Sequence, residues 1–223
     1  MEEVLQHQPA EVQTFLLHTS ILERFSALLC DAVLSRGAEE QGGGGKSASA
    51  PLHPCTPAQI LEYLDRANLF LVPLDDRREW YRYHRLFADL LQRQLAQRHP
   101  DLVPELHRRA SAWYEDQELL PESIDHALAA EDLERAAVLI AQVSEALMMR
   151  SELMTLRKWL GALPEALLNR HPDLCAYQAW LLLLSGEPLR LIESRIAAVR
   201  KHCLLYTSPS PRDLSTSRMP SSA

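Results

Sequence analysis

The sequence contains little glycine, and most of that glycine lies in one place. Only 7 of the 223 residues are glycine, and four of them form the run Gly42–Gly45. Valine and threonine are also sparse, whereas leucine and alanine are abundant. Doubly wound sheets and β-sandwiches need Val/Ile-rich strands and many glycine turns, so the composition excludes these classes. It favours a mainly helical protein.

Cysteine and long apolar runs are scarce as well. The four cysteines are scattered and form no CxxC pair, which indicates reduced thiols. The longest apolar runs, such as Leu69–Leu74 and Trp180–Leu184, are too short to span a bilayer. The acidic start at Met1 lacks the plan of a signal peptide. We therefore expect a cytoplasmic protein with no membrane segment.

Positive charge is in deficit, because the net charge is −7 and the isoelectric point is near 5.7. Attraction of the whole chain to nucleic acid is therefore not expected. The exception is an arginine-rich window. Its members are Arg77, Arg78, Arg82, Arg85, Arg93, Arg98, Arg108 and Arg109. We interpret it as a solvated face or as a contact with another domain of the same chain.

The last residues, Cys203–Ala223, differ in character from the rest. They show no periodicity and resemble a translated sequencing adaptor. The adaptor sequence TGTCTCTTATACACATCT encodes Cys203–Ser208, and CCGAGCCCACGAGAC continues in frame as Pro209–Asp213. We therefore interpret 203–223 as a disordered artefactual tail, and we expect the natural protein to continue past His202.

The first part of the chain predicts three helices, a β-hairpin and a fourth helix. The first helix begins in Gln8–His18, and Ser20 and Glu23 form a capping-box pattern that would open the second. A second capping box at Thr56–Gln59, with proline at the first helical position, opens the third. Strand-like segments at 68–74 and 79–83 flank a turn, and a helix follows from His84. This order predicts a winged-helix domain over residues 1–98, with a flexible Gly-rich loop at 36–55.

The remainder, residues 101–202, reads as short helices separated by breaks of two to four residues. Pro121, Pro164 and Pro188 mark helix starts, and Asp132 and Asp173 are candidate caps. The pattern predicts stacked helical hairpins similar to tetratricopeptide arrays, truncated at the end of the chain.

Motifs for chemistry are weak. Gly42–Ser47 resembles a phosphate-binding loop around Lys46, but Glu40 holds a glycine position, and no strand precedes and no helix follows it. His53 with Cys55, and His99 with His107, lack the further ligands that a metal requires. No GxSxG or HExxH pattern occurs. We expect no enzyme activity, no bound cofactor and no metal in this chain.

Several segments together resemble the MalT-like, LuxR-type transcription regulators of bacteria, which belong to the signal-transducing ATPases. The most specific segments are Leu64–Asp76 and Trp80–Leu91, and Val12–Leu22, Leu106–Tyr114 and Ala127–Asp132 agree. In that family an N-terminal P-loop ATPase precedes the winged helix. A helical-repeat sensor follows, and a C-terminal helix-turn-helix binds DNA. The long loop at 37–55 departs from the family.

The resemblance implies a fragment that supplies the regulatory winged helix, which senses the nucleotide state, and the first helical repeats of the sensor and oligomerisation domain. ADP would hold the full-length protein inactive, and inducer with ATP would open it into an oligomer. The implied partners are its own upstream ATPase domain, further copies on activation, and DNA through the absent helix-turn-helix. Base reading by the winged helix itself is not expected, because Glu62, Asp65 and Arg66 leave its third helix without net positive charge.

Two alternatives remain open. The chain would also fit the MalT-like middle region of a serine/threonine kinase, or a free-standing helical scaffold that only binds proteins. Genomic sequence beyond both ends would discriminate among the three.

His84 is the candidate site residue. Signal-transducing ATPases place a winged-helix histidine at the junction of the second wing strand and the fourth helix, against the β-phosphate of ADP. The resemblance carries this role to His84 in the full-length protein; its neighbours Tyr83 and Arg85 depart from the family's usual Met-His-Asp. An imidazole N–H at a helix N-terminus can donate to phosphate oxygen. The residues alone favour a capping or packing histidine instead.

Overall fold

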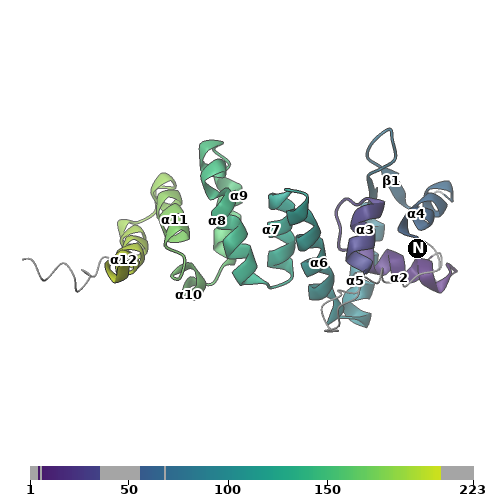
Figure 1. Ribbon diagram of the computed structural model, residues 1–223, viewed down its shortest axis with the longest axis horizontal. Helices are drawn as coiled ribbons and strands as arrows, with labels where there is room; N and C mark the ends of the chain where they lie inside the picture. Colours follow the sequence, from purple (N-terminus) through teal and green to yellow (C-terminus); the bar gives the residue numbers. More distant parts are fainter. Residues whose placement is uncertain (1–4, 6, 36–55, 68, 207–223) are drawn as a thin grey trace, which may run out of the picture. The chain divides into compact units, whose positions relative to one another are not determined.

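The computed structural model describes residues 5, 7–35, 56–67 and 69–206, and the chain divides into two compact units, Met1–Asp132 and Leu133–Ala223. Helices dominate both units (Figure 1). The described residues form one two-stranded sheet, which lies in the first unit. The predictions for the loop at 36–55 and for residues 207–223 concern residues outside the described part.

The first unit begins with α2 (Ala10–Thr19), α3 (Ala27–Leu34) and α4 (Pro57–Arg66). The capping box at α4 is confirmed: Gln59 N–H donates to Thr56 Oγ1, and Thr56 N–H donates to Gln59 Oε1. This reciprocal pair satisfies two backbone N–H donors at the helix start, as its sequence pattern predicts.

The capping box predicted at Ser20 is wrong. Ser20 ends α2, and its buried hydroxyl donates to the carbonyl of Leu17 at 2.7 Å. The cap of α3 is Ser26, whose hydroxyl accepts from the N–H of Leu29 at 3.3 Å. The physical reason is Phe25, which lies between the two serines. It pairs with Tyr81, so the helix begins only after it.

The wing is a short antiparallel hairpin of β1 (Leu71–Pro73) and β2 (Tyr81–Tyr83), in the register that pairs residue 71 with 83 and 73 with 81. Asp75 holds the turn, since its carboxylate accepts from the N–H groups of Glu79 and Trp80. Phe25 extends the pairing: it exchanges two backbone hydrogen bonds of 2.8 Å with Tyr81.

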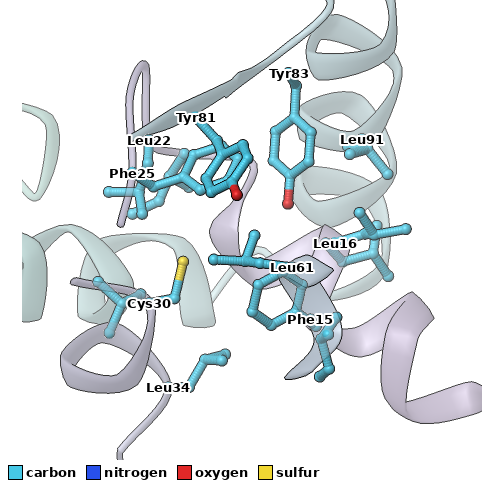
Figure 2. Close-up of a cluster of buried hydrophobic side chains, with 14 of the residues drawn as sticks. Phe15, Leu16, Leu22, Phe25, Cys30, Leu34, Leu61, Tyr81, Tyr83 and Leu91 are labelled. Carbon is cyan, nitrogen blue, oxygen red and sulfur yellow. The ribbon is translucent and has the colours of Figure 1, made fainter. Parts of the chain in front are cut away.

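Helix α5 (Arg85–Arg98) follows the wing directly. The buried cluster of the first unit brings aromatic rings from the wing against side chains of the helices (Figure 2). Tyr83 packs against Phe25 at a ring distance of 4.6 Å and against Phe87 of α5 at 5.9 Å. The wing is thus fixed to the helices by apolar packing rather than standing free.

Two further helices complete the first unit, α6 (Leu102–Asp116) and α7 (Leu120–Ala129). Helix α6 packs on α3, and Arg109 of α6 donates to the carbonyl of Val33 at 3.1 Å. The compact unit therefore extends past residue 98, where the sequence pattern placed the end of the winged helix.

The second unit contains the helices α8 (Leu133–Met149), α9 (Leu153–Ala162), α10 (Glu165–Leu168), α11 (Pro172–Leu184) and α12 (Leu189–Tyr206). Asp173 does not cap α11, because the N-cap position is His171 and no side-chain cap bond forms there. Gly186, at φ 69°, ends the helix in the left-handed region that favours glycine. Helix α12 continues to Tyr206, past Cys203, where the sequence placed the start of the tail.

The predicted fold class is confirmed: the protein is mainly α, with a winged helix followed by helical hairpins. None of the described helices combines the length and apolarity needed to cross a membrane.

Candidate functional site

His84 lies at the junction that the sequence predicted, as the N-cap residue between β2 and α5. Its backbone is held on both sides. The N–H donates to the carbonyl of Phe70 at 2.8 Å, and its own carbonyl accepts from the N–H groups of Phe87 and Ala88 at 2.9 and 3.0 Å. The imidazole is exposed and makes no capping hydrogen bond. His84 therefore occupies the N-cap position, but its side chain neither caps the helix nor is buried.

The segments on which His84 lies are held together by a backbone hydrogen bond and by aromatic packing. Phe70 has a φ of 55°, which is rare for a bulky residue, and the hydrogen bond from His84 helps to hold it there. The ring of Phe70 stacks on that of Phe87 at 4.6 Å. Because Phe87 is buried in the first turn of α5, the strand, the helix start and His84 form one fixed corner.

The other candidates of the sequence do not form sites in the described part. The phosphate-loop-like run around Lys46, and the pair His53 and Cys55, lie outside the described residues. His99 ends α5, and its ring lies 6.5 Å from that of His18, whereas His107 contacts His126. Among the described residues, no group of three or more His, Cys, Asp or Glu side chains could hold a metal ion.

Sequence reasoning missed a polar seam between α6 and α7. The Nδ1 atoms of His107 and His126 lie 2.8 Å apart, and Ser111 and Ser123 are hydrogen-bonded one turn away. Burial lowers the pKa of His107 to about 4; burial, and then the neighbouring His107, lower the pKa of His126 to about 4. The signal was present, because each helix carries a His and a Ser three or four positions apart inside its apolar stripe.

A groove of about 620 Å³ lies between α3, α4, the wing and α6. Trp80 and Trp113 lie in its lining with their ring centroids 6.4 Å apart, and Arg78 pairs with Asp65 across it. On the same α4 face Arg66 pairs with Glu62. Three arginines of the arginine-rich window are thus paired with carboxylates, Arg78 with Asp65 and both Arg108 and Arg109 with Glu105.

Comparison with known proteins finds a family match for the first part of the chain. Residues 1–103 match the family described as the MalT winged helix domain. This stretch includes the three helices, the wing, α5 and His84. Residues 1–103 are therefore similar to a MalT winged helix domain.

The likeness to MalT-like proteins continues past this domain. The serine/threonine-protein kinase PknK of Mycobacterium tuberculosis is 35% identical over 187 residues, which are 84% of this chain and 15% of the kinase. The HTH-type transcriptional regulator MalT of Serratia proteamaculans is 34% identical over 181 residues, or 81% of this chain and 18% of the regulator. MalT of Yersinia pestis is 33% identical over the same length. The chain thus spans less than a fifth of these relatives.

The aligned length shows where the likeness lies. An alignment of 187 residues cannot fit within the first 132, so it includes part of the second unit. The predicted resemblance to MalT-like regulators is confirmed for the MalT winged helix and for helices after it. His84 keeps its place at the corner between wing and α5 of this domain, and its contact with a nucleotide stays a prediction.

Proposed function

We propose that this chain is the regulatory middle of a longer, LuxR-type transcription regulator, in which the MalT winged helix reports the nucleotide state of an ATPase domain of the same protein. It has no catalytic activity of its own in this proposal. ATP and ADP bind to the ATPase domain, activation brings copies of the protein together, and a separate helix-turn-helix binds DNA. The support is the family of residues 1–103 and the regulators named MalT that align with most of the chain.

The observation that carries the proposal is the corner at His84. The imidazole is exposed, its backbone is fixed by three hydrogen bonds, and the N-terminal turn of α5 lies directly beneath it. A neutral imidazole N–H or a charged imidazolium at this position would donate to a phosphate oxygen, and the helix dipole would favour the anion. A fixed donor of this kind would favour the closed, ADP-bound form over the open form.

The charges of α4 support a regulatory rather than a base-reading winged helix. Base readers present polar and basic side chains on the helix that enters the major groove. Here the exposed Glu62 of α4 pairs with Arg66, and the half-buried Asp65 of the same helix pairs with Arg78. Such a surface would repel DNA phosphates or lose its ion pairs on binding.

The kinase alternative has its own support, because PknK aligns with 84% of the chain at 35% identity. In that case the same winged helix would regulate phosphoryl transfer instead of DNA binding. The genomic sequence beyond both ends of this chain decides between the two proposals. An upstream P-loop ATPase and a downstream LuxR helix-turn-helix identify the regulator, and a kinase domain identifies the alternative.

The test is His84→Ala in the full-length protein. A charge-assisted hydrogen bond contributes roughly 1.5–3 kcal/mol, so the affinity for ADP should fall about 10- to 100-fold, measured by calorimetry. Activity without inducer should rise, because ADP would no longer favour the closed form.

The matched control is His99→Ala, which removes an exposed imidazole at the opposite end of α5. It should leave ADP affinity unchanged, and His84→Asn, which keeps an N–H donor, should restore part of the loss. A folded His84→Ala protein with unaltered ADP affinity would show that His84 has no contact with the nucleotide.

A further inference from the structure

The groove between α3, α4, the wing and α6 has the size of a small-molecule pocket. Its volume is about 620 Å³, and pockets for small ligands usually measure roughly 300–1,000 Å³. The elements around it all belong to the first unit (Figure 1). His84 is not among its lining residues, so this groove is distinct from the corner to which the nucleotide contact is assigned.

One wall of the groove, the indole of Trp80, is held in place by three contacts. Its backbone N–H donates to the Asp75 carboxylate at 3.1 Å, and its ring lies edge to face with that of Trp113 at 6.4 Å. The guanidinium of Arg24 lies 5.3 Å from the centroid of the Trp80 ring and also pairs with Glu122 of α7. These contacts fix the wall, so the groove does not depend on a ligand for its shape.

The indole rings make the groove attractive to cations. The face of a tryptophan ring carries negative charge density and attracts a cation placed over it. Arg24 already uses the Trp80 ring in this way. Trp113 also lines the groove, and none of the described cationic side chains lies over its ring. Trp113 thus offers an aromatic ring to a cation that enters from solution.

The charged side chains that line the groove leave one carboxylate without a counter-ion. Arg66 pairs with Glu62, and Arg78 pairs with Asp65, so these four charges cancel. The remaining charged group is Glu79, which is exposed and forms no ion pair with any residue that the structure describes. Three carboxylates and two arginines thus give the groove one net negative charge.

The remaining lining is largely apolar. Ala27 and Leu28 of α3 and Leu61 of α4 contribute aliphatic side chains. Leu28 is 74% exposed, which leaves an uncovered aliphatic surface in the same groove as the aromatic rings. The apolar body of a ligand would remove this surface from water, which favours binding.

We propose that this groove binds a small organic cation, which carries an ammonium or guanidinium group on an apolar body. The cationic group lies against the Trp113 ring and pairs with the Glu79 carboxylate, and the apolar body covers Leu28. An anionic ligand would be repelled by Glu79, and a neutral one would gain from the apolar surface alone. A cation bound here contacts both the wing and α6, so it would stabilise the first unit against unfolding. This site goes beyond the proposed function and does not depend on it.

Three probes with the same phenylethyl body separate the effect of charge from that of apolar burial. They are phenylethylammonium, the neutral phenylethanol and the anion phenylpropionate. Each is titrated at neutral pH into the isotope-labelled 223-residue chain, and the indole N–H signals are followed by NMR. Trp80 and Trp113 report on the groove, whereas Trp159 and Trp180 of the second unit serve as internal controls.

Phenylethylammonium should shift the signals of Trp80 and Trp113 saturably and leave those of Trp159 and Trp180 unchanged. Its affinity should exceed that of the two other probes by about tenfold, because only the cation gains both the ring contact and the carboxylate. It should also raise the melting temperature of the chain more than they do. Equal affinities for the three probes would overturn the inference, and so would shifts of all four signals.

The substitution Glu79→Gln keeps the shape of the side chain and removes its charge. It should weaken the binding of phenylethylammonium by about threefold to fivefold and leave that of phenylethanol unchanged. The matched control is Asp76→Asn, which removes an exposed carboxylate from the same turn but outside the groove lining, and it should leave both affinities unchanged.

Equal effects of the two substitutions would show that the cation responds to general surface charge, against the inference. Signals of Trp80 and Trp113 that move with protein concentration in the absence of a probe would assign the groove to a second copy of the chain and would likewise contradict it. Because no nucleotide is present, all of these results are independent of the ADP contact proposed for His84.

Discussion

At the scale of residues, a buried line of hydroxyl hydrogen bonds joins α2 to the wing. Thr19 Oγ1 donates to the carbonyl of Phe15 at 2.7 Å, so its oxygen must accept the hydrogen of the Tyr83 hydroxyl, also at 2.7 Å. Burial raises the pKa of Tyr83 well above its usual value, which keeps the phenol protonated as a donor. The line therefore has one direction, from the wing to the helix.

This direction makes two substitutions unequal. Tyr83→Phe removes a donor and leaves Thr19 bonded to Phe15, so it should cost about 0.5–1.5 kcal/mol. Thr19→Val strands the buried Tyr83 hydroxyl without its acceptor and should cost more, about 1–3 kcal/mol. The double variant should be close to Tyr83→Phe alone. Chemical denaturation of the four proteins measures this cycle, and equal costs for the two single variants would contradict the assigned direction.

At the scale of elements, the α6–α7 hairpin should be sensitive to acid. The paired imidazoles of His107 and His126 have pKa values lowered to about 4, against about 6.5 in an unfolded chain. Between these values the unfolded state binds more protons, so stability is complete above pH 6.5 and falls as the pH drops towards 4. Each imidazole can contribute a slope of at most about 1.4 kcal/mol per pH unit.

Thermal melts of the chain between pH 7 and pH 4 measure this slope. The double variant His107→Asn/His126→Asn keeps a donor and an acceptor at the Nδ1 positions but cannot take up a proton, so its melting temperature should fall less over this range. The control, His84→Asn, replaces an exposed imidazole and should behave as the unmodified chain does. Identical pH profiles for the double variant and the unmodified chain would assign the acid sensitivity to other groups.

At the scale of the whole molecule, the winged helix depends on the hairpin that follows it. Leu106, Ala110 and Tyr114 of α6 are buried in the core of the first unit, and the Tyr114 hydroxyl donates to the carbonyl of Arg24 at 3.3 Å. A chain that ends at Asp132 should fold with the near-ultraviolet signal of Trp80 and Trp113. A chain that ends at Arg98 should lose several kcal/mol of stability. Truncating a single large buried side chain already costs about 3–5 kcal/mol.

Circular dichroism and urea denaturation of the two shortened chains test this dependence. Equal unfolding midpoints would show that the winged helix is complete at residue 98. The family match ends at residue 103, close to the boundary that the sequence pattern predicts, while the compact unit continues to Asp132. The two boundaries answer different questions, since one marks a shared family segment and the other marks where packing ends.

Much of the architecture was predictable from local sequence. Apolar spacing located the helices, the reciprocal Thr56 and Gln59 pair marked the start of α4, and the turn before Glu79 marked the wing. The same analysis placed His84 at the start of α5, where the structure has it. These features depend on residues within a few positions of one another, so propensity, capping and turn chemistry decide them without reference to the rest of the chain.

Other features depended on which surfaces meet. Ser20 has the local pattern of a cap, but Phe25 pairs with Tyr81 and moves the helix start to Ser26. His107 and His126 look like ordinary surface histidines until α6 and α7 close and place their Nδ1 atoms 2.8 Å apart. Local sequence sets what each segment can form, whereas burial and long-range pairing choose among those options, because their free energy arises only when distant segments are in contact.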